Sequence, residues 1–136
     1  MESTVIWSSG MSFKSAQDGH DLMLDLPVDM GGTDQGPKPK TLLLTGLGGC
    51  TAMDVVSILK KMQVEIEGLK IHISADLTEE HPKVFKSIHI RYEFSGKDLP
   101  LSKLERAVNL SLEKYCGVSA MLAKACPINH EIVVCG

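Results

Sequence analysis

The sequence of 136 residues predicts an α+β fold in a single domain that spans residues 1–136. Segments with strand-like alternation and segments with helical periodicity are grouped along the chain, which is typical of α+β proteins with largely antiparallel sheets. The chain is long enough to bury one hydrophobic core and too short for two ordinary domains. The expected order of elements is βββ-α-ββ-α-α-β, with antiparallel sheets around a central buried helix.

The N-terminal part predicts three short strands, at residues 3–8, 11–16 and 20–26. The turn-forming pairs Ser9-Gly10 and Asp18-Gly19 separate them, and an Asp-Gly pair between two strands is a hairpin signal. In the third segment leucine recurs at every second position, which predicts a half-buried strand.

The middle of the chain predicts a loop rich in glycine and proline over residues 27–39, followed by a helix over residues 41–62. Three glycines interrupt the helical pattern, so we expect a break or kink over residues 46–49. The segment 41–59 is apolar on nearly all sides, which predicts burial in a core or a subunit interface. It reads poorly as a membrane span because it contains Asp54 and the three glycines.

The second half of the chain predicts two long strands, two helices and a last strand. The strands carry apolar residues at alternate positions, and the first of these helices has an apolar stripe with helical spacing. The elements are expected at residues 69–77, 84–94, 101–115, 118–124 and 128–134.

Composition indicates which partners the protein can bind and in which compartment it is expected. The formal net charge of −3 argues against nucleic-acid binding, which requires a basic surface. The first residues carry neither the basic cluster nor the apolar segment of a secretory signal, so we expect a cytoplasmic protein with no membrane association. In a reducing compartment the four cysteines are structural, metal-binding or redox-active, rather than a disulfide scaffold.

Cys50 and Cys116 are the most reactive side chains that the sequence offers. Cys50 follows two glycines within the predicted helix, and Cys116 lies beside Gly117 at a corner between two helices. A helix N-terminus or a nearby cation, such as Lys114 beside Cys116, favours the reactive thiolate. On pattern alone, the structural interpretation of each cysteine as a small buried hydrophobe is the preferred one. The two cysteines are 66 residues apart, which fits neither a C-x-x-C redox motif nor a zinc ribbon.

Cys126, His130 and Cys135 have spacings that metal ligands sometimes use. His130 and Cys135 are five residues apart on one predicted strand, so their side chains would face opposite sides. The structural interpretation is therefore preferred for all three residues, and no metal site is expected.

Two stretches of the chain resemble signatures of the OsmC/Ohr family. Residues 39–62, PKTLLLTGLGGCTAMDVVSILKKM, are similar to the central helix of that family. LERAV at residues 104–108 and EKYCGVS at residues 113–119 resemble its second signature. The order of elements also matches, and the similarity covers essentially the whole chain. GGCTA is most similar to the OsmC-like branch, whose members are often described only as redox proteins or predicted regulators of disulfide formation.

The resemblance implies an intertwined homodimer in which two sheets wrap around central helices, with the active site at the dimer interface. It implies that Cys50 is the peroxidatic cysteine and Cys116 the resolving one. The protein would be a thiol-dependent reductase of organic hydroperoxides, restored by a small thiol or dithiol. Neither a metal nor an organic cofactor is required for this chemistry.

The chain departs from the family's peroxidase pattern at two positions. Family peroxidases carry an arginine that activates the thiolate and a glutamate that orients the arginine. In an ungapped count these positions fall near Met11 and on Lys40, and no arginine precedes Arg91. Lys40 or Lys14 is the candidate for this positive charge, and Lys114 is the further candidate beside Cys116, although lysine is not a bidentate substitute for arginine.

Two other functions stay open on the sequence. A non-catalytic dimer of the same fold would hold a small apolar or sulfur-containing ligand at its interface. That function predicts ligand-dependent thermal stabilisation that persists in a Cys50→Ser variant. A purely structural or interaction role predicts two inert buried thiols and no pocket.

Overall fold

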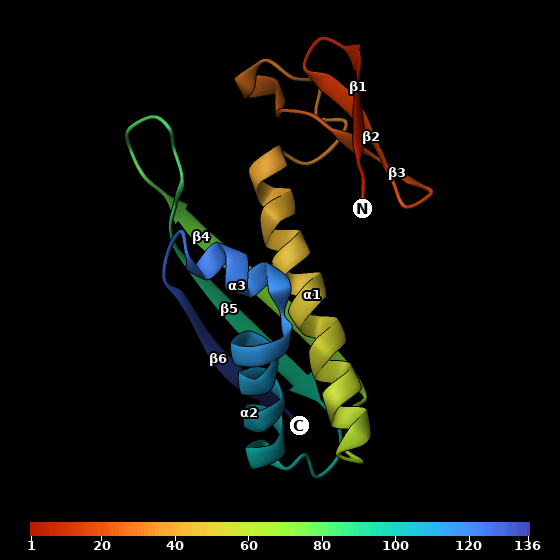
Figure 1. The fold of residues 1–136 in the computed structure, drawn as a ribbon, viewed down its shortest axis with the longest axis vertical. Coiled ribbons are helices and arrows are strands. Elements are labelled where there is room, and N and C mark those ends of the chain that lie inside the picture. Colours follow the sequence, from red (N-terminus) through yellow and green to blue (C-terminus); the bar gives the residue numbers. More distant parts are fainter. The chain divides into compact units, whose positions relative to one another are not determined.

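The computed structural model describes all 136 residues and divides them into two compact units, Met1–Leu43 and Leu44–Gly136. Helix α1 (Pro39–Lys61) begins in the first unit and continues into the second. The first unit also holds three strands and a 3₁₀ turn (Val28–Met30), and the second holds the remaining helices and strands (Figure 1). The predicted α+β class and the order of its elements are confirmed.

In the first unit, β1 (Thr4–Ser9), β2 (Ser12–Gln17) and β3 (His20–Leu24) form an antiparallel sheet. Asp18 and Gly19 connect β2 to β3 with φ angles of 52° and 76°. Positive φ at both central positions is the two-residue hairpin turn expected of an Asp-Gly pair. The three predicted strands are therefore confirmed, and the third ends two residues earlier than expected.

A buried carboxylate organises the loop that follows β3. Asp25 is 2% exposed, and its oxygens accept hydrogen bonds from the backbone N–H groups of Leu26, Thr33 and Gln35 and from the Thr33 hydroxyl. These bonds, led by the one from Leu26, lower the pKa of Asp25 below its ordinary value. A Cβ at Gly32 would lie 1.9 Å from the Leu26 carbonyl oxygen, so this close turn requires glycine.

The second unit contains a three-stranded sheet in the order β4-β5-β6. Strands β4 (Gly68–Leu77) and β5 (Phe85–Ser95) are antiparallel, whereas β5 and β6 (Ile128–Cys135) are parallel. The expectation of antiparallel sheets is therefore wrong for this one pair. Parallel neighbours need a long crossover connection, and the helices between β5 and β6 provide it.

Three helical segments make this crossover: α2 (Leu101–Leu110), a π-helical segment (Ser111–Tyr115) and α3 (Gly117–Ala123). The predicted helix over residues 101–115 thus changes its hydrogen-bonding pattern at Ser111. A π-helical segment within a longer helix is often found at a functional site.

Helix α1 is continuous over its 23 residues, so the predicted break at residues 46–49 is wrong. A Cβ on Gly48 would lie 2.7 Å from Cδ1 of Ile73 on β4, so glycine here allows close packing against the sheet. Cys50 consequently lies in the middle of a helix. The free N–H groups and the positive end of the helix dipole lie in the first turn of a helix, so they are not beside Cys50.

The helices α1, α2 and α3 lie on one face of the sheet of the second unit (Figure 1). Alternate residues of β5 point to this face and are fully buried beneath α1 and α2. The core side chains that are at most 1% exposed include Leu47, Val55, Leu59, Ile88, Ile90, Tyr92, Phe94, Leu104 and Val108. This core fixes the relative positions of α1 and of the crossover helices.

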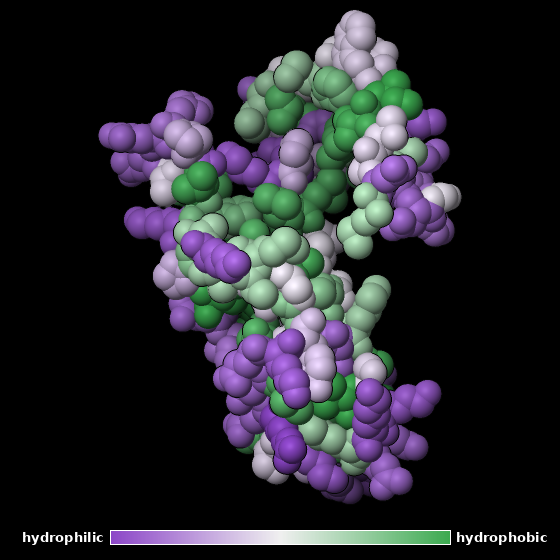
Figure 2. Space-filling model, viewed as in Figure 1, coloured by the Kyte–Doolittle hydropathy of each residue, from purple (hydrophilic) through white to green (hydrophobic).

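Part of the surface of α1 is apolar and exposed within one chain. Met53 is 76% exposed and Val56 is 48% exposed. By length and composition alone α1 could cross a membrane, and 22% of its apolar window is buried. The expected burial on nearly all sides is therefore not reached within a single chain. Figure 2 shows apolar side chains between charged ones over the lower parts of α1 and α2.

Candidate functional site

The fold brings Cys50 and Cys116 together in the second unit. Cys50 lies on α1 and is partly exposed, whereas Cys116 is 3% exposed and precedes α3. Their Sγ atoms and a carboxylate oxygen of Asp54 all lie within 4.8 Å of one another. All four cysteines of the chain are free thiols. The site therefore joins two thiols and one carboxylate from two distant parts of the sequence.

Cys116 is held by the turn between the π-helical segment and α3. Cys116 is the N-cap residue of α3, and its sulfur accepts a hydrogen bond from the backbone N–H of Ser119 at 3.4 Å. The Ser119 hydroxyl donates to the backbone carbonyls of Cys116, at 3.0 Å, and Leu112, at 3.3 Å. These bonds fix the position of the buried sulfur beside α1.

Asp54 is a site residue that the sequence interpretation missed. It lies four residues after Cys50, and side chains at this spacing lie on the same face of a helix. The i, i+4 spacing from Cys50 is the signal in the sequence that could indicate Asp54. It points to a shared site only together with the position of Cys116, whose sulfur lies beside both residues. Asp54 Oδ2 accepts a hydrogen bond from the Ser111 hydroxyl at 3.1 Å.

A chain of buried hydroxyl groups leads away from Asp54. Thr51 Oγ1 lies 2.8 Å from the Ser111 hydroxyl and 2.7 Å from the Tyr92 hydroxyl. Because Ser111 gives its one hydrogen to Asp54, Thr51 must donate to Ser111, and Tyr92 must donate to Thr51. The hydrogen bonds therefore all point toward the carboxylate.

The pKa values of the site reflect burial and nearby negative charge. Burial, together with Cys116 and Asp54, raises the pKa of Tyr92 to about 12, and the Thr51 hydrogen bond only partly offsets this. Tyr92 therefore keeps its proton as the donor at the start of the hydroxyl chain. The pKa of Cys116 is also raised, mainly by burial and then by a hydrogen bond with Cys50. Hydrogen bonds with Ser119 act in the opposite direction and lower it. None of the groups that shift these two pKa values is a lysine or an arginine.

The structure gives separate surroundings for two of the lysines predicted to activate a thiolate. Lys40 is exposed in the first turn of α1 and belongs to the first unit. The amino group of Lys114 lies over the ring of Tyr115, 5.4 Å from its centroid. Met11, at the position counted for the family arginine, is 49% exposed in the first unit. An activating role of either lysine stays a prediction.

The other cysteines do not join the site. Cys126 is buried where the chain leaves α3, and Cys135 is exposed at the end of β6. His130 on β6 makes an edge contact with the ring of Tyr92, with the ring centroids 6.2 Å apart. The structure gathers no ligand cluster from Cys126, His130 and Cys135.

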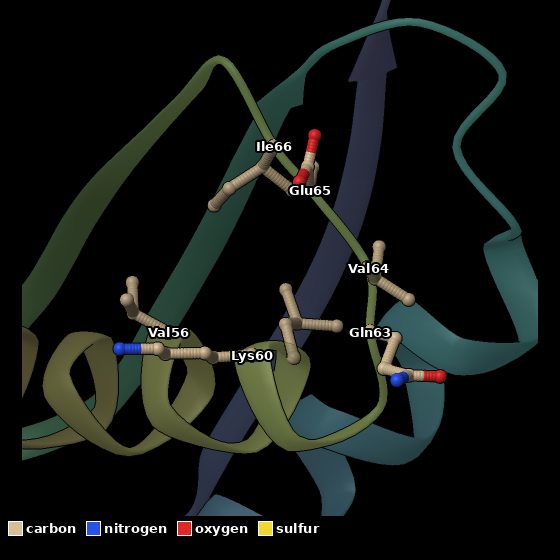
Figure 3. A pocket seen from close by; sticks show the side chains of 7 residues that line it. Val56, Lys60, Gln63, Val64, Glu65 and Ile66 are labelled. Carbon is tan, nitrogen blue, oxygen red and sulfur yellow. The ribbon is translucent and has the colours of Figure 1, made fainter.

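Two pockets border α1 in the second unit. One of about 310 Å³ has Asp54 in its wall and is otherwise lined by Ser57, Ile58, Lys61, Met62, Leu110 and Tyr115. Another, of about 430 Å³, lies where α1 ends, between Val56, Lys60 and the following segment that leads to Ile66 (Figure 3). We call the group of Cys50, Cys116 and Asp54 the dithiol site. Of these two pockets, only the first is lined by one of its residues, Asp54.

Comparisons with known proteins agree with this fold. The family model described as OsmC-like protein matches residues 32–131. Protein YhfA of Escherichia coli strain K12 is 36% identical over 135 residues, which cover 98% of each chain. A hypothetical protein from Aquifex aeolicus VF5 has a TM-score of 0.84 and 34% identity, and the match covers 99% of this chain and 97% of that one.

A more distant structure shares the fold alone. It is described as an organic hydroperoxide resistance protein OsmC, predicted redox protein, from Legionella pneumophila. Its TM-score is 0.74 at 18% identity, and the match covers 97% of this chain and 95% of that chain. The similarity therefore extends over nearly the full length of both proteins.

Proposed function

We propose that this chain, which belongs to the OsmC-like protein family, is a cysteine-based redox protein that reduces organic hydroperoxides. The main support is the approach of the Cys50 and Cys116 sulfur atoms to within 4.8 Å. A disulfide requires about 2.05 Å between sulfurs, so each side chain must rotate toward the other. The proposed location is the cytoplasm, where thiol reductants can regenerate the pair.

We assign the first reaction to Cys50 and the second to Cys116. Partial exposure gives a hydroperoxide access to Cys50, whereas Cys116 is 3% exposed. Because burial and the hydrogen bond with Cys50 raise its pKa, Cys116 keeps its proton at neutral pH. Its S–H group can therefore donate to the Cys50 sulfur and stabilise a thiolate there.

The proposed cycle uses only the two sulfurs and an external reductant. The Cys50 thiolate attacks the O–O bond of the hydroperoxide and becomes a sulfenic acid, while the alkoxide takes up a proton and leaves as an alcohol. The Cys116 sulfur then attacks the sulfenic acid, which forms the disulfide and releases water. A dithiol, or two small thiols, supplies two electrons and two protons to restore both cysteines.

The pocket beside Asp54 supports an organic rather than an inorganic hydroperoxide as substrate. Its volume of about 310 Å³ suits a small organic molecule. Ile58, Met62 and Leu110 make much of its lining apolar. These side chains would bind the alkyl or aryl part of a substrate, which hydrogen peroxide lacks.

The direct test is the thiol state of the wild-type protein after exposure to cumene hydroperoxide. We expect one intramolecular disulfide between Cys50 and Cys116, identified by mass spectrometry of non-reduced peptides. Cys135, which is exposed and outside the site, is the internal control for unspecific oxidation. If Cys50 and Cys116 stay reduced under excess hydroperoxide, the proposed function is wrong.

We further propose that the protein is a homodimer that covers the exposed apolar surface of α1. The support is the exposure of Met53, 76%, and Val56, 48%, on a helix whose other face, with Leu47, Val55 and Leu59, packs in the core. Contiguous exposed apolar residues commonly mark a protein interface.

Light scattering is expected to give the mass of two chains for the wild-type protein and of one chain for Met53→Glu, because a carboxylate without a partner is costly to bury. Met121→Glu, at a 66% exposed methionine on α3, is the matched control and should stay dimeric. A monomeric wild type, or a dimeric Met53→Glu variant, would contradict this interface.

A further inference from the structure

The site formed by Cys50, Cys116 and Asp54 gathers three groups that can carry negative charge and can bind a metal ion. Two thiols and the Asp54 carboxylate converge within 4.8 Å. With both cysteines deprotonated, the three groups would repel one another unless a cation lay between them.

We propose that the reduced protein binds a thiophilic divalent cation, such as Zn²⁺, through Cys50 Sγ, Cys116 Sγ and a carboxylate oxygen of Asp54. Two thiolates and a carboxylate are a ligand set that suits zinc. Binding replaces the two thiol protons by the metal, so two protons are released for each ion bound.

The geometry requires only a small closure of the site. Zinc–sulfur bonds of about 2.3 Å in a tetrahedron place two sulfurs about 3.8 Å apart. The three ligand atoms already lie within 4.8 Å of one another, so rotation of the side chains by a fraction of a rotamer step suffices. A tetrahedral ion would keep one position for water or a small thiol.

The surrounding hydrogen bonds hold two of the three ligands in place. The Ser111 hydroxyl donates to Asp54 Oδ2, and the Ser119 N–H donates to Cys116 Sγ. Donors of this kind orient carboxylate and thiolate ligands in metal sites. Cys50 and Asp54 sit one turn apart on α1, so the helix itself fixes their spacing.

The metal and the disulfide exclude each other. Oxidation by a hydroperoxide would remove the two thiolates as ligands, and a bound ion would block the attack of Cys50 on a peroxide. The ion would therefore protect the reduced pair from oxidation. This site does not depend on the proposed peroxidase activity, because it requires only the reduced thiols and the carboxylate.

The test is a titration of the untagged, reduced full-length protein with Zn²⁺ in competition with a chromophoric chelator. We expect one ion per chain, and a loss of affinity of about tenfold or more in each of Cys50→Ser, Cys116→Ser and Asp54→Asn. Cys135→Ser, at an exposed cysteine, and Asp98→Asn, at an exposed carboxylate, are the matched controls and should bind like the wild type.

A measurement on the wild type alone guards against variants that fail to fold. Zn²⁺ should protect the partly exposed Cys50, but not Cys135, from alkylation by iodoacetamide, and Co²⁺ should give a sulfur-to-metal charge-transfer band that excess chelator abolishes. Binding without either protection or the band, or binding unchanged by Asp54→Asn, would overturn the three-ligand site. Zinc binding in a protein that leaves hydroperoxides intact would retain this site and reject the proposed function.

Discussion

Replacing Cys50 by serine is expected to reduce the rate of hydroperoxide reduction by roughly a thousandfold or more. A serine hydroxyl is not ionised at neutral pH, so the variant lacks the nucleophile that attacks the O–O bond. The measurement is the consumption of cumene hydroperoxide with a dithiol as reductant. Cys135→Ser makes the same chemical change at an exposed cysteine outside the site and should retain full activity.

The partner substitution distinguishes the roles of the two cysteines. Cys116→Ser keeps the attacking sulfur and removes the one that condenses with the sulfenic acid. We therefore expect a first turnover at nearly the wild-type rate, followed by a Cys50 sulfenic acid that can be trapped with dimedone. If Cys116→Ser instead lost the first turnover while Cys50→Ser kept it, the two roles would have to be exchanged.

Leu104→Ala in α2 is expected to cause a large loss of stability. Leu104 is completely buried in the core, and removing a buried leucine side chain costs about 2–5 kcal/mol of unfolding free energy. Leu101→Ala, one turn earlier at a 50% exposed position of the same helix, should change it by less than about 0.5 kcal/mol. Urea denaturation of the reduced protein measures both values.

The stability prediction also concerns the site, because α2 leads through the π-helical segment to Cys116. A cavity under α2 is expected to loosen that connection and to slow disulfide formation between Cys116 and Cys50 in the folded protein. Equal losses of stability in Leu104→Ala and Leu101→Ala would show that the packing of α2 against the sheet had been misjudged.

Local pattern was a good guide where local interactions decide the structure. The Asp18-Gly19 pair forms the hairpin that its sequence predicts, because positive φ at two positions is a property of those residues themselves. The glycines of α1 show the opposite case. Their low helix propensity predicted a break, but Gly48 lies against Ile73, and packing against the sheet favours an unbroken helix.

The direction of β6 could not be predicted from its own residues. Alternating apolar residues mark a strand equally well in a parallel or an antiparallel pair. The parallel pairing of β5 with β6 follows from the path of α2 and α3 across the sheet, which is a property of the whole second unit. Similarly, the exposure of Met53 and Val56 depends on which residues of the folded chain pack against α1, so the tertiary structure was needed to establish it.

The sequence by itself determined the kind of chemistry available: two cysteines in an α+β chain, within motifs that resemble those of a redox family. Periodicity and turn residues act between near neighbours, so they can be read from a linear chain. Only the tertiary structure decided that Cys50 and Cys116 meet, that Asp54 joins them, and that a hydroxyl chain from Tyr92 ends at this carboxylate. These contacts join α1, β5 and the crossover helices, and they arise from burial of a shared core that no local pattern encodes.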